Sequence, residues 1–108
     1  MTVAIARVTI FVGGSRSLKD KRMVVRRVKD LVREKFNAAI AEVGDLEGWQ
    51  RAVLGITMVG NDRRFVESSL DEVLRFVRGK AEVTREEREL QTFGDAELAG
   101  PDYKHWDG

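Results

Sequence analysis

Two stretches of the chain alternate between apolar and other side chains with a period of two, which is typical of strands with one buried face. They cover residues 3–12 and 51–59. The face of the first that we expect to be buried consists of Ala4, Ala6, Val8, Ile10 and Val12. The corresponding face of the second consists of Ala52, Leu54, Ile56 and Met58. A shorter apolar run over 38–43 predicts another strand, joined to 51–59 by the turn composition of 44–48.

Two other stretches have the period of 3.6 residues that indicates helices with one apolar side. The first follows a glycine pair and is capped by Ser17, with Asp20 completing an approximate capping box. Its apolar side consists of Val24, Val25, Val28, Leu31, Val32 and Phe36. The second begins at Asn61 or Asp62, both favoured caps, and ends at Gly79. Its apolar side consists of Val66, Leu70, Val73, Leu74 and Val77.

A fourth strand is predicted over 81–93, where a charged run suits a sheet edge that is exposed to water. The order strand, helix, strand, strand, helix, strand predicts an α+β fold of the ferredoxin-like split type. Such a fold has a four-stranded antiparallel sheet with two helices on one face. A helix over 80–92 is the alternative, but Val83 and Leu90 would give it little apolar side.

The two halves of this order also predict a meeting of two loops. We expect right-handed crossovers to make strands 3–12 and 51–59 a parallel central pair. The loops 13–21 and 60–64 would then be neighbours, and two helix amino-termini would favour an anion between them. The alternative is that the capping side chains already satisfy those backbone donors.

The composition narrows the chemistry that the chain can perform. Its 108 residues carry no cysteine and one histidine, His105, which excludes disulfides, thiolate metal sites and paired-histidine zinc sites. We expect no catalytic residues, no metal and no cofactor. One domain over 1–93 and a mobile acidic tail over 94–108 fit the length. With neither a signal-peptide pattern nor a membrane span in the sequence, we expect a cytoplasmic protein without a membrane partner.

Charge is unevenly distributed although the net charge is only +1. Residues 1–36 carry ten bases and three acids, which makes this third of the chain a candidate for contact with a polyanion. One side of the first helix holds a basic stripe, which consists of Lys19, Arg22, Arg26, Lys29 and Arg33. Like charges four residues apart repel one another, and Asp30 offsets Arg26 only. An ordinary solvated helix face is the alternative.

The candidate anion-binding or nucleic-acid-binding residues combine this stripe with the two loops. They are Arg16, Lys19, Lys21, Arg22, Arg26, Lys29, Arg33, Arg63 and Arg64. Lys21 lies at the end of the apolar side, where its long stem can carry the ammonium group to water.

Four segments of the sequence resemble those of a known family. They are 14–22 (GSRSLKDKR), 41–45 (AEVGD), 49–55 (WQRAVLG) and 61–62 (ND). In this order they are similar to the YlxP family of bacterial proteins, which carries a domain-of-unknown-function label, over about residues 1–92. The resemblance implies a ferredoxin-like fold and frequent gene association with translation-initiation and ribosome-maturation factors. It implies no agreed enzymatic activity and nothing for the tail.

Three hypotheses of function follow, and the first is contact with RNA or the ribosome through the basic residues. Such contact should use the helix, because RNA-reading sheets stack bases on several aromatic residues. Here only Phe11, with Trp49 as a second candidate, could serve, and strand 51–59 has no RNP-like Gly-aromatic pattern. Trp49 is interpreted as a packing residue at a strand entrance rather than a stacking platform.

The second hypothesis is a homodimeric interaction or regulatory protein that uses the sheet face away from the helices. That face would carry Ile5, Thr9, Phe11, Val53 and Val59. The alternative is that the tail covers it. The third hypothesis, with the least support, is an enzyme that acts on phosphorylated substrates, because Arg16 with Asn61 close by loosely resembles acylphosphatases.

Overall fold

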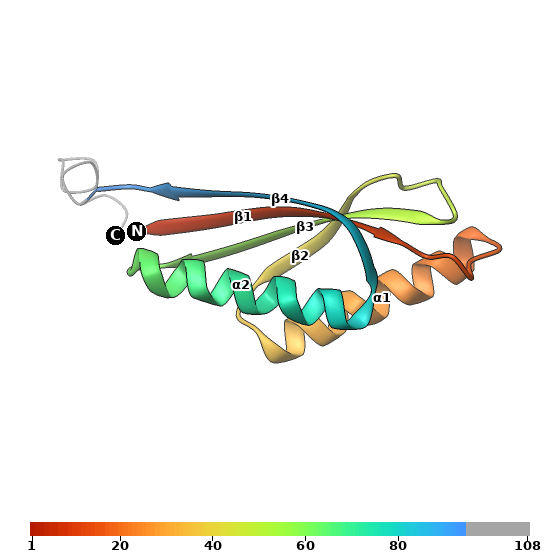
Figure 1. The fold of residues 1–108 in the computed structure, drawn as a ribbon, viewed down its shortest axis with the longest axis horizontal. Coiled ribbons are helices and arrows are strands. Elements are labelled where there is room, and N and C mark those ends of the chain that lie inside the picture. The colour runs from red at the N-terminus through yellow and green to blue at the C-terminus, as the bar shows by residue number, and fades with distance from the viewer. Residues whose placement is uncertain (95–108) are drawn as a thin grey trace, which may run out of the picture.

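The described part of the chain, residues 1–94, forms one sheet with both helices on one of its faces in this computed structural model (Figure 1). Its elements are β1 (Thr2–Phe11), α1 (Leu18–Lys35), β2 (Ala39–Gly44), β3 (Arg51–Gly60), α2 (Arg63–Lys80) and β4 (Glu82–Thr92). The strands form an antiparallel sheet in the order β2-β3-β1-β4. The ferredoxin-like prediction is therefore confirmed, and a strand stands where a helix over 80–92 was the alternative. The tail prediction lies, from residue 95 on, outside the described residues.

Both helices begin where their capping side chains predict. Ser17 Oγ accepts a hydrogen bond of 3.1 Å from the backbone N–H of Asp20, whose carboxylate accepts one of 3.1 Å from that of Arg16. In α2, Asp62 Oδ1 accepts bonds of 2.9 and 3.2 Å from the backbone N–H groups two and three residues later. Backbone N–H groups at both helix starts therefore donate to capping side chains of the chain itself. This is the arrangement given above as the alternative to an anion site.

The helices α1 and α2 bury corresponding positions against the sheet. Each has 18 residues, so Leu18 of α1 corresponds to Arg63 of α2, and the later residues correspond in turn. The buried positions of α1 are Lys21, Val25, Val28 and Val32. Those of α2 are Val66, Leu70, Val73, Leu74 and Val77. Three positions are apolar in both helices, but Lys21 occupies the position that Val66 has in α2.

The central strands β1 and β3 are antiparallel, so the expected parallel pair is wrong. Their register joins Thr2 to Gly60 and Phe11 to Arg51. Each helix connects two strands that run in the same direction, β1 to β2 and β3 to β4. The hairpin between β2 and β3 reverses the chain, and β3 therefore runs against β1.

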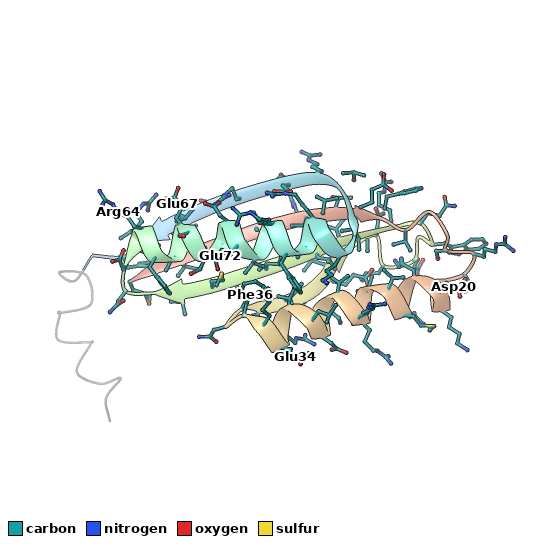
Figure 2. The ribbon with its side chains drawn as sticks, turned by 60° about the horizontal axis from the view of Figure 1, so that its bottom comes forward. Asp20, Glu34, Phe36, Arg64, Glu67 and Glu72 are labelled. Atoms are coloured by element: carbon teal, nitrogen blue, oxygen red, sulfur yellow. The ribbon has the colours of Figure 1, made fainter. Side chains whose placement is uncertain are left out.

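The expected meeting of loops 13–21 and 60–64 is wrong for the same reason. The ten residues of β3, about 30 Å of strand, separate the end of β1 from the end of β3. Figure 1 shows the start of α1 and the start of α2 at opposite ends of the molecule, and Figure 2 shows Asp20 and Arg64 in the same relation.

Candidate functional site

The basic stripe lies on the side of α1 that faces the edge of the sheet formed by β2. Arg33 Nη2 donates a hydrogen bond of 2.8 Å to the carbonyl oxygen of Ile40, in β2. The other members follow on the same side toward the start of the helix. Lys29 is half-buried and the remaining members are exposed. The stripe is therefore a continuous cationic surface along one edge of the molecule.

No carboxylate of residues 1–94 neutralises this surface. None of the stripe's cationic groups, and not that of Arg16, lies within 4.0 Å of a carboxylate oxygen in this part of the chain. The spacing of Arg26 and Asp30 permits an ion pair, but none forms. Because the cations lack internal partners here, an external anion would meet them without displacing one.

On the matching side of α2, two charged residues are paired with residues of β4. Arg78 donates hydrogen bonds of 2.6 and 3.0 Å to the two carboxylate oxygens of Glu86. Asp71 lies 2.6 Å from the guanidinium of Arg88. The hydrogen bond from Arg78 lowers the pKa of Glu86, and the same bond raises the pKa of Arg78. This side of α2 is engaged with the neighbouring strand.

The two helices differ residue by residue along these sides. Arg22 and Arg26 of the stripe correspond to Glu67 and Asp71 in α2. Arg33 corresponds to Arg78, and both reach the edge strand that follows their helix. The strand after α1 offers Arg33 a backbone carbonyl, whereas the strand after α2 offers Arg78 a carboxylate. The positive surface of α1 is thus a property of its own sequence and not of the fold.

Lys21 does not belong to this surface, because its side chain is fully buried. Its Nζ donates hydrogen bonds of 2.6, 3.3 and 3.4 Å to the carbonyl oxygens of Asp45, Leu46 and Arg51. The carboxylate of Glu42 lies 3.0 Å away and forms a partly buried ion pair with it. The expectation that Lys21 reaches water is wrong, because the β2–β3 hairpin closes over it. The sequence segments around Lys21, Glu42 and Arg51 meet at this point.

Arg63 and Arg64 lie at the other end of the molecule, at the start of α2. Arg63 Nη1 donates a hydrogen bond of 2.8 Å to Thr92 Oγ1 at the end of β4. These two arginines cannot share one anion with the start of α1 (Figure 2). Arg16 and Asn61 are separated in the same way, so the expectation that Asn61 lies close to Arg16 is wrong.

The β2–β3 hairpin presents an exposed aromatic side chain that sequence reasoning misjudged. Trp49 is 57% exposed and does not pack into a strand entrance. Together with Phe11 and Arg51 it lines a hollow of about 660 Å³ at this end of the sheet. Arg51 Nε donates a hydrogen bond of 2.9 Å to the carboxylate of Asp45 across the hairpin. The composition of the turn did not reveal this exposure, because it depends on how the hairpin closes.

The sheet face away from the helices carries all the residues that were expected to form a dimer surface. These are Ile5, Thr9, Phe11, Val53 and Val59, which alternate along β1 and β3 with buried residues. Thr9 and Val53 are half-buried and the other three are exposed. Val43 leans over Gly55, and the two line a hollow of about 500 Å³.

An ion pair joins β1 and β4 on this face, and β4 also places Arg85, Glu89 and Gln91 on it. Arg7 donates hydrogen bonds of 2.9 and 2.8 Å to Glu87 of β4, and this contact lowers the pKa of Glu87. The two charges therefore satisfy one another at the surface of the sheet.

Two findings on the described residues concern metal binding and the crossing of a membrane. Within 1–94 no three His, Cys, Asp or Glu side chains are grouped so that they could hold a metal ion. Neither helix of this part of the chain has the length and apolar character that crossing a membrane requires.

Comparison with known proteins gives one family and several structures of the same fold. A sequence model described as "Protein of unknown function (DUF503)" matches residues 3–89. The "Uncharacterized protein YlxP" of Bacillus subtilis (strain 168) is 41% identical over 69 residues, which are 64% of this chain and 75% of the relative. The de novo designed protein Foldit4 is 15% identical over 86% of this chain and 98% of its own, with a TM-score of 0.50. The de novo designed protein LFR1 1, described as having a ferredoxin fold, is 16% identical over 86% and 87%, with a TM-score of 0.49.

Proposed function

Because the chain belongs to the family described as a protein of unknown function (DUF503), we propose its function from its own surface: it is a non-catalytic protein whose basic stripe binds the phosphate backbone of RNA. The YlxP-like resemblance stated from the sequence is confirmed by the relative from Bacillus subtilis. The gene association that this resemblance implies favours ribosomal RNA or a ribosomal component as the partner. Either partner would place the protein in the cytoplasm.

The unneutralised stripe on α1 is the observation that carries this proposal. Its members recur every three or four residues, so from Lys19 to Arg33 they span about 21 Å of helix. An extended cationic row of this kind suits a chain of phosphates better than a single small anion. The long side chains of Lys and Arg can adjust to the positions of phosphates, and such contacts do not depend on the identity of the bases.

The affinity for RNA at several salt concentrations tests the proposal. If five stripe cations contact phosphates of a single strand, the logarithm of affinity should fall against the logarithm of salt with a slope of about −3.5. The variant Lys19→Glu/Arg22→Glu/Arg26→Glu should weaken binding and reduce the slope to about −1.4. The matched control Arg64→Glu/Arg75→Glu/Lys80→Glu makes the same change of charge on exposed positions of α2.

Two results separate the stripe from a general effect of charge. Binding that falls in the α1 variant and persists in the α2 variant supports the stripe. Equal affinity and equal salt dependence of wild type and the α1 variant would remove the proposal, and so would equal losses in both variants. Circular dichroism of each variant confirms that the helices are retained.

A second function, homodimerisation through the outer sheet face, is favoured by the exposed apolar residues there. Ile5 is 41% exposed and Val59 is 61% exposed on a sheet face that no helix of residues 1–94 covers. Pairing of two copies would remove this apolar surface from water. It would leave the stripe of each copy accessible, so the two functions are compatible.

Light scattering over a range of concentrations tests this second function. We expect a dimer whose association is abolished by Ile5→Glu/Val59→Glu and persists when residues 94–108 are removed. A monomer in both the full and the shortened chain would contradict it. Dimerisation of the shortened chain alone would instead favour the alternative that the tail covers this face.

A further inference from the structure

We propose that the hollow formed by Trp49, Phe11 and Arg51 binds an unpaired base of the RNA strand whose phosphates lie on the basic stripe. This inference rests on the proposed function and adds a preference for single-stranded over double-stranded RNA. It replaces the interpretation of Trp49 as a packing residue.

The hollow has the chemical character that base stacking requires. Trp49 is 57% and Phe11 40% exposed, although burial of such rings is strongly favourable. Both line the same hollow of about 660 Å³, and the guanidinium of Arg51 adds a planar cation to it. Aromatic rings and arginine planes are the groups on which proteins stack unpaired bases. Asp45 holds Arg51 in place by a bond of 2.9 Å.

The hairpin that carries Trp49 is held in position by two other parts of the chain. The buried ammonium group of Lys21 binds the carbonyl oxygens of Asp45, Leu46 and Arg51, which flank the tryptophan on both sides. The backbone N–H of Val12 donates a bond of 2.7 Å to the carbonyl oxygen of Gln50. An aromatic ring on a loop fixed in this way loses little conformational freedom when a base stacks on it.

The hollow lies at the same end of the molecule as the start of the basic stripe (Figure 1), on the outer face of the sheet to which Phe11 and Arg51 belong. β2 runs antiparallel to α1, so Arg33 lies beside Ile40 and Lys21 lies beside Asp45. The stripe therefore leads along β2 toward the hairpin, and Figure 1 shows the start of α1 and the hairpin at the same end of the molecule. Arg16 follows Phe11 by five residues, which is at most about 18 Å of chain. A strand that follows the stripe would pass around the hairpin to reach the hollow.

An unpaired base is the occupant that these two features favour together. A duplex would satisfy the stripe, but its stacked and paired bases could not enter the hollow. The negatively charged phosphates would pair with the cations of the stripe. The base itself is neutral, so the carboxylates of Asp45 and Glu47 at the rim of the hollow do not repel it.

Tryptophan fluorescence and affinity together test this inference. The chain has two tryptophans, so Trp106→Phe leaves Trp49 as the one reporter. A single-stranded oligoadenylate of about 12 nucleotides should quench its emission, and Trp49→Ala should weaken binding of that strand roughly tenfold. A duplex RNA of the same length should bind Trp49→Ala and wild type within about twofold of one another. Trp49→Phe should restore most of the affinity, because it keeps an aromatic ring.

The control variant Leu46→Ala removes another exposed apolar side chain from the same hairpin, and we expect it to bind both RNAs like wild type. If Trp49→Ala binds the single strand as well as wild type while the charge-reversed stripe does not, the base site is wrong and the proposed function stands. If Trp49→Ala weakens single strand and duplex equally, the hairpin acts without base stacking, and the inference is again wrong. If the charge-reversed stripe binds as well as wild type, the proposed function fails and takes the inference with it.

Discussion

The two helices of this protein have the same length, the same kind of cap and four buried positions in common, yet they use their charges in opposite ways. In α2 the side that faces the edge strand pairs Arg78 with Glu86 and Asp71 with Arg88. In α1 the corresponding side is a row of bases whose ammonium and guanidinium groups find no carboxylate in residues 1–94. The fold thus places both surfaces, and the sequences of each helix and of the edge strand beside it determine which one stays available to a partner.

The buried positions show the reverse contrast. Lys21 lies under the hairpin where Val66 lies in α2, and it takes part in an ion pair and three hydrogen bonds. In α1 charge is therefore enclosed at one position and exposed along a row. In α2 two charged residues are paired with residues of the edge strand β4. The comparison teaches that the position of a basic residue on a helix does not by itself reveal whether it binds a partner.

The largest effect on stability should come from removing the buried ammonium group of Lys21. We expect Lys21→Ala to lower the free energy of unfolding by about 3–5 kcal/mol, because Glu42 and three carbonyl groups would lose their cation. Urea unfolding followed by circular dichroism measures this loss. Lys19→Ala, an exposed neighbour, should change stability by about 0.5 kcal/mol or less.

A double variant shows whether charge or packing is responsible for that loss. Lys21→Ala/Glu42→Gln should be less unstable than the sum of its two single variants, because no buried carboxylate is left unpaired. Strict additivity of the two substitutions would contradict the contrast drawn between Lys21 and Val66.

The second effect concerns binding and makes α1 resemble α2. Arg22→Glu/Arg26→Asp gives α1 the residues that α2 has at these positions. We expect affinity for RNA at low salt to fall roughly tenfold or more, since two phosphate contacts become repulsive. Filter binding measures the affinity. Stability should change by only about 0.5 kcal/mol, because both arginines are exposed. An unchanged affinity would show that the unneutralised row is an ordinary solvated helix face.

The smallest effect is on stability at low pH, and it reports the ion pairs that β4 forms with α2 and β1. Hydrogen bonds from Arg78 and Arg7 lower the pKa values of Glu86 and Glu87 below their ordinary value of 4.5. The stabilisation from both pairs is therefore complete above pH 4.5 and is lost as the pH falls through the lower pKa values of the folded state. Thermal unfolding between about pH 5 and pH 2.5 should show a shallower loss in Glu86→Gln/Glu87→Gln than in wild type.

The control for this prediction lies on the other helix. Glu34→Gln changes an exposed carboxylate of α1 that forms no ion pair with residues 1–94, and it should keep the wild-type loss of stability in acid. A steeper acid transition in Glu86→Gln/Glu87→Gln would contradict the sign of the effect.

The sequence predicted those features that depend on neighbouring residues. The starts of the helices followed from Ser17 and Asp62, and the buried face of β1 followed from its alternation. The strand order followed from the succession of elements. The direction of β3 relative to β1 was predicted wrongly, although the reversal at the hairpin between β2 and β3 was sufficient to determine it.

The features that the sequence did not predict depend on contacts between distant residues. Lys21 is buried because carbonyl groups 24, 25 and 30 residues away close around it, and its place at the end of the apolar side of the helix did not by itself reveal that they would. The exposure of Trp49 likewise follows from the shape of a loop rather than from its composition. The weak signal that could have identified the first contact is that Lys21 lies in one of the segments that resemble the family, and Glu42 and Asp45 lie together in another.

The contact between Arg33 and Ile40 has a consequence for how the molecule behaves at high concentration. A β-strand at the margin of a sheet can recruit further strands through its outward backbone groups, and β2 carries few charges that would prevent this. By occupying the Ile40 oxygen at 2.8 Å, the guanidinium takes away one of the acceptors on which lateral growth depends. Replacing Arg33 with alanine should therefore shorten the lag before fibrillar aggregates form, as thioflavin fluorescence would record.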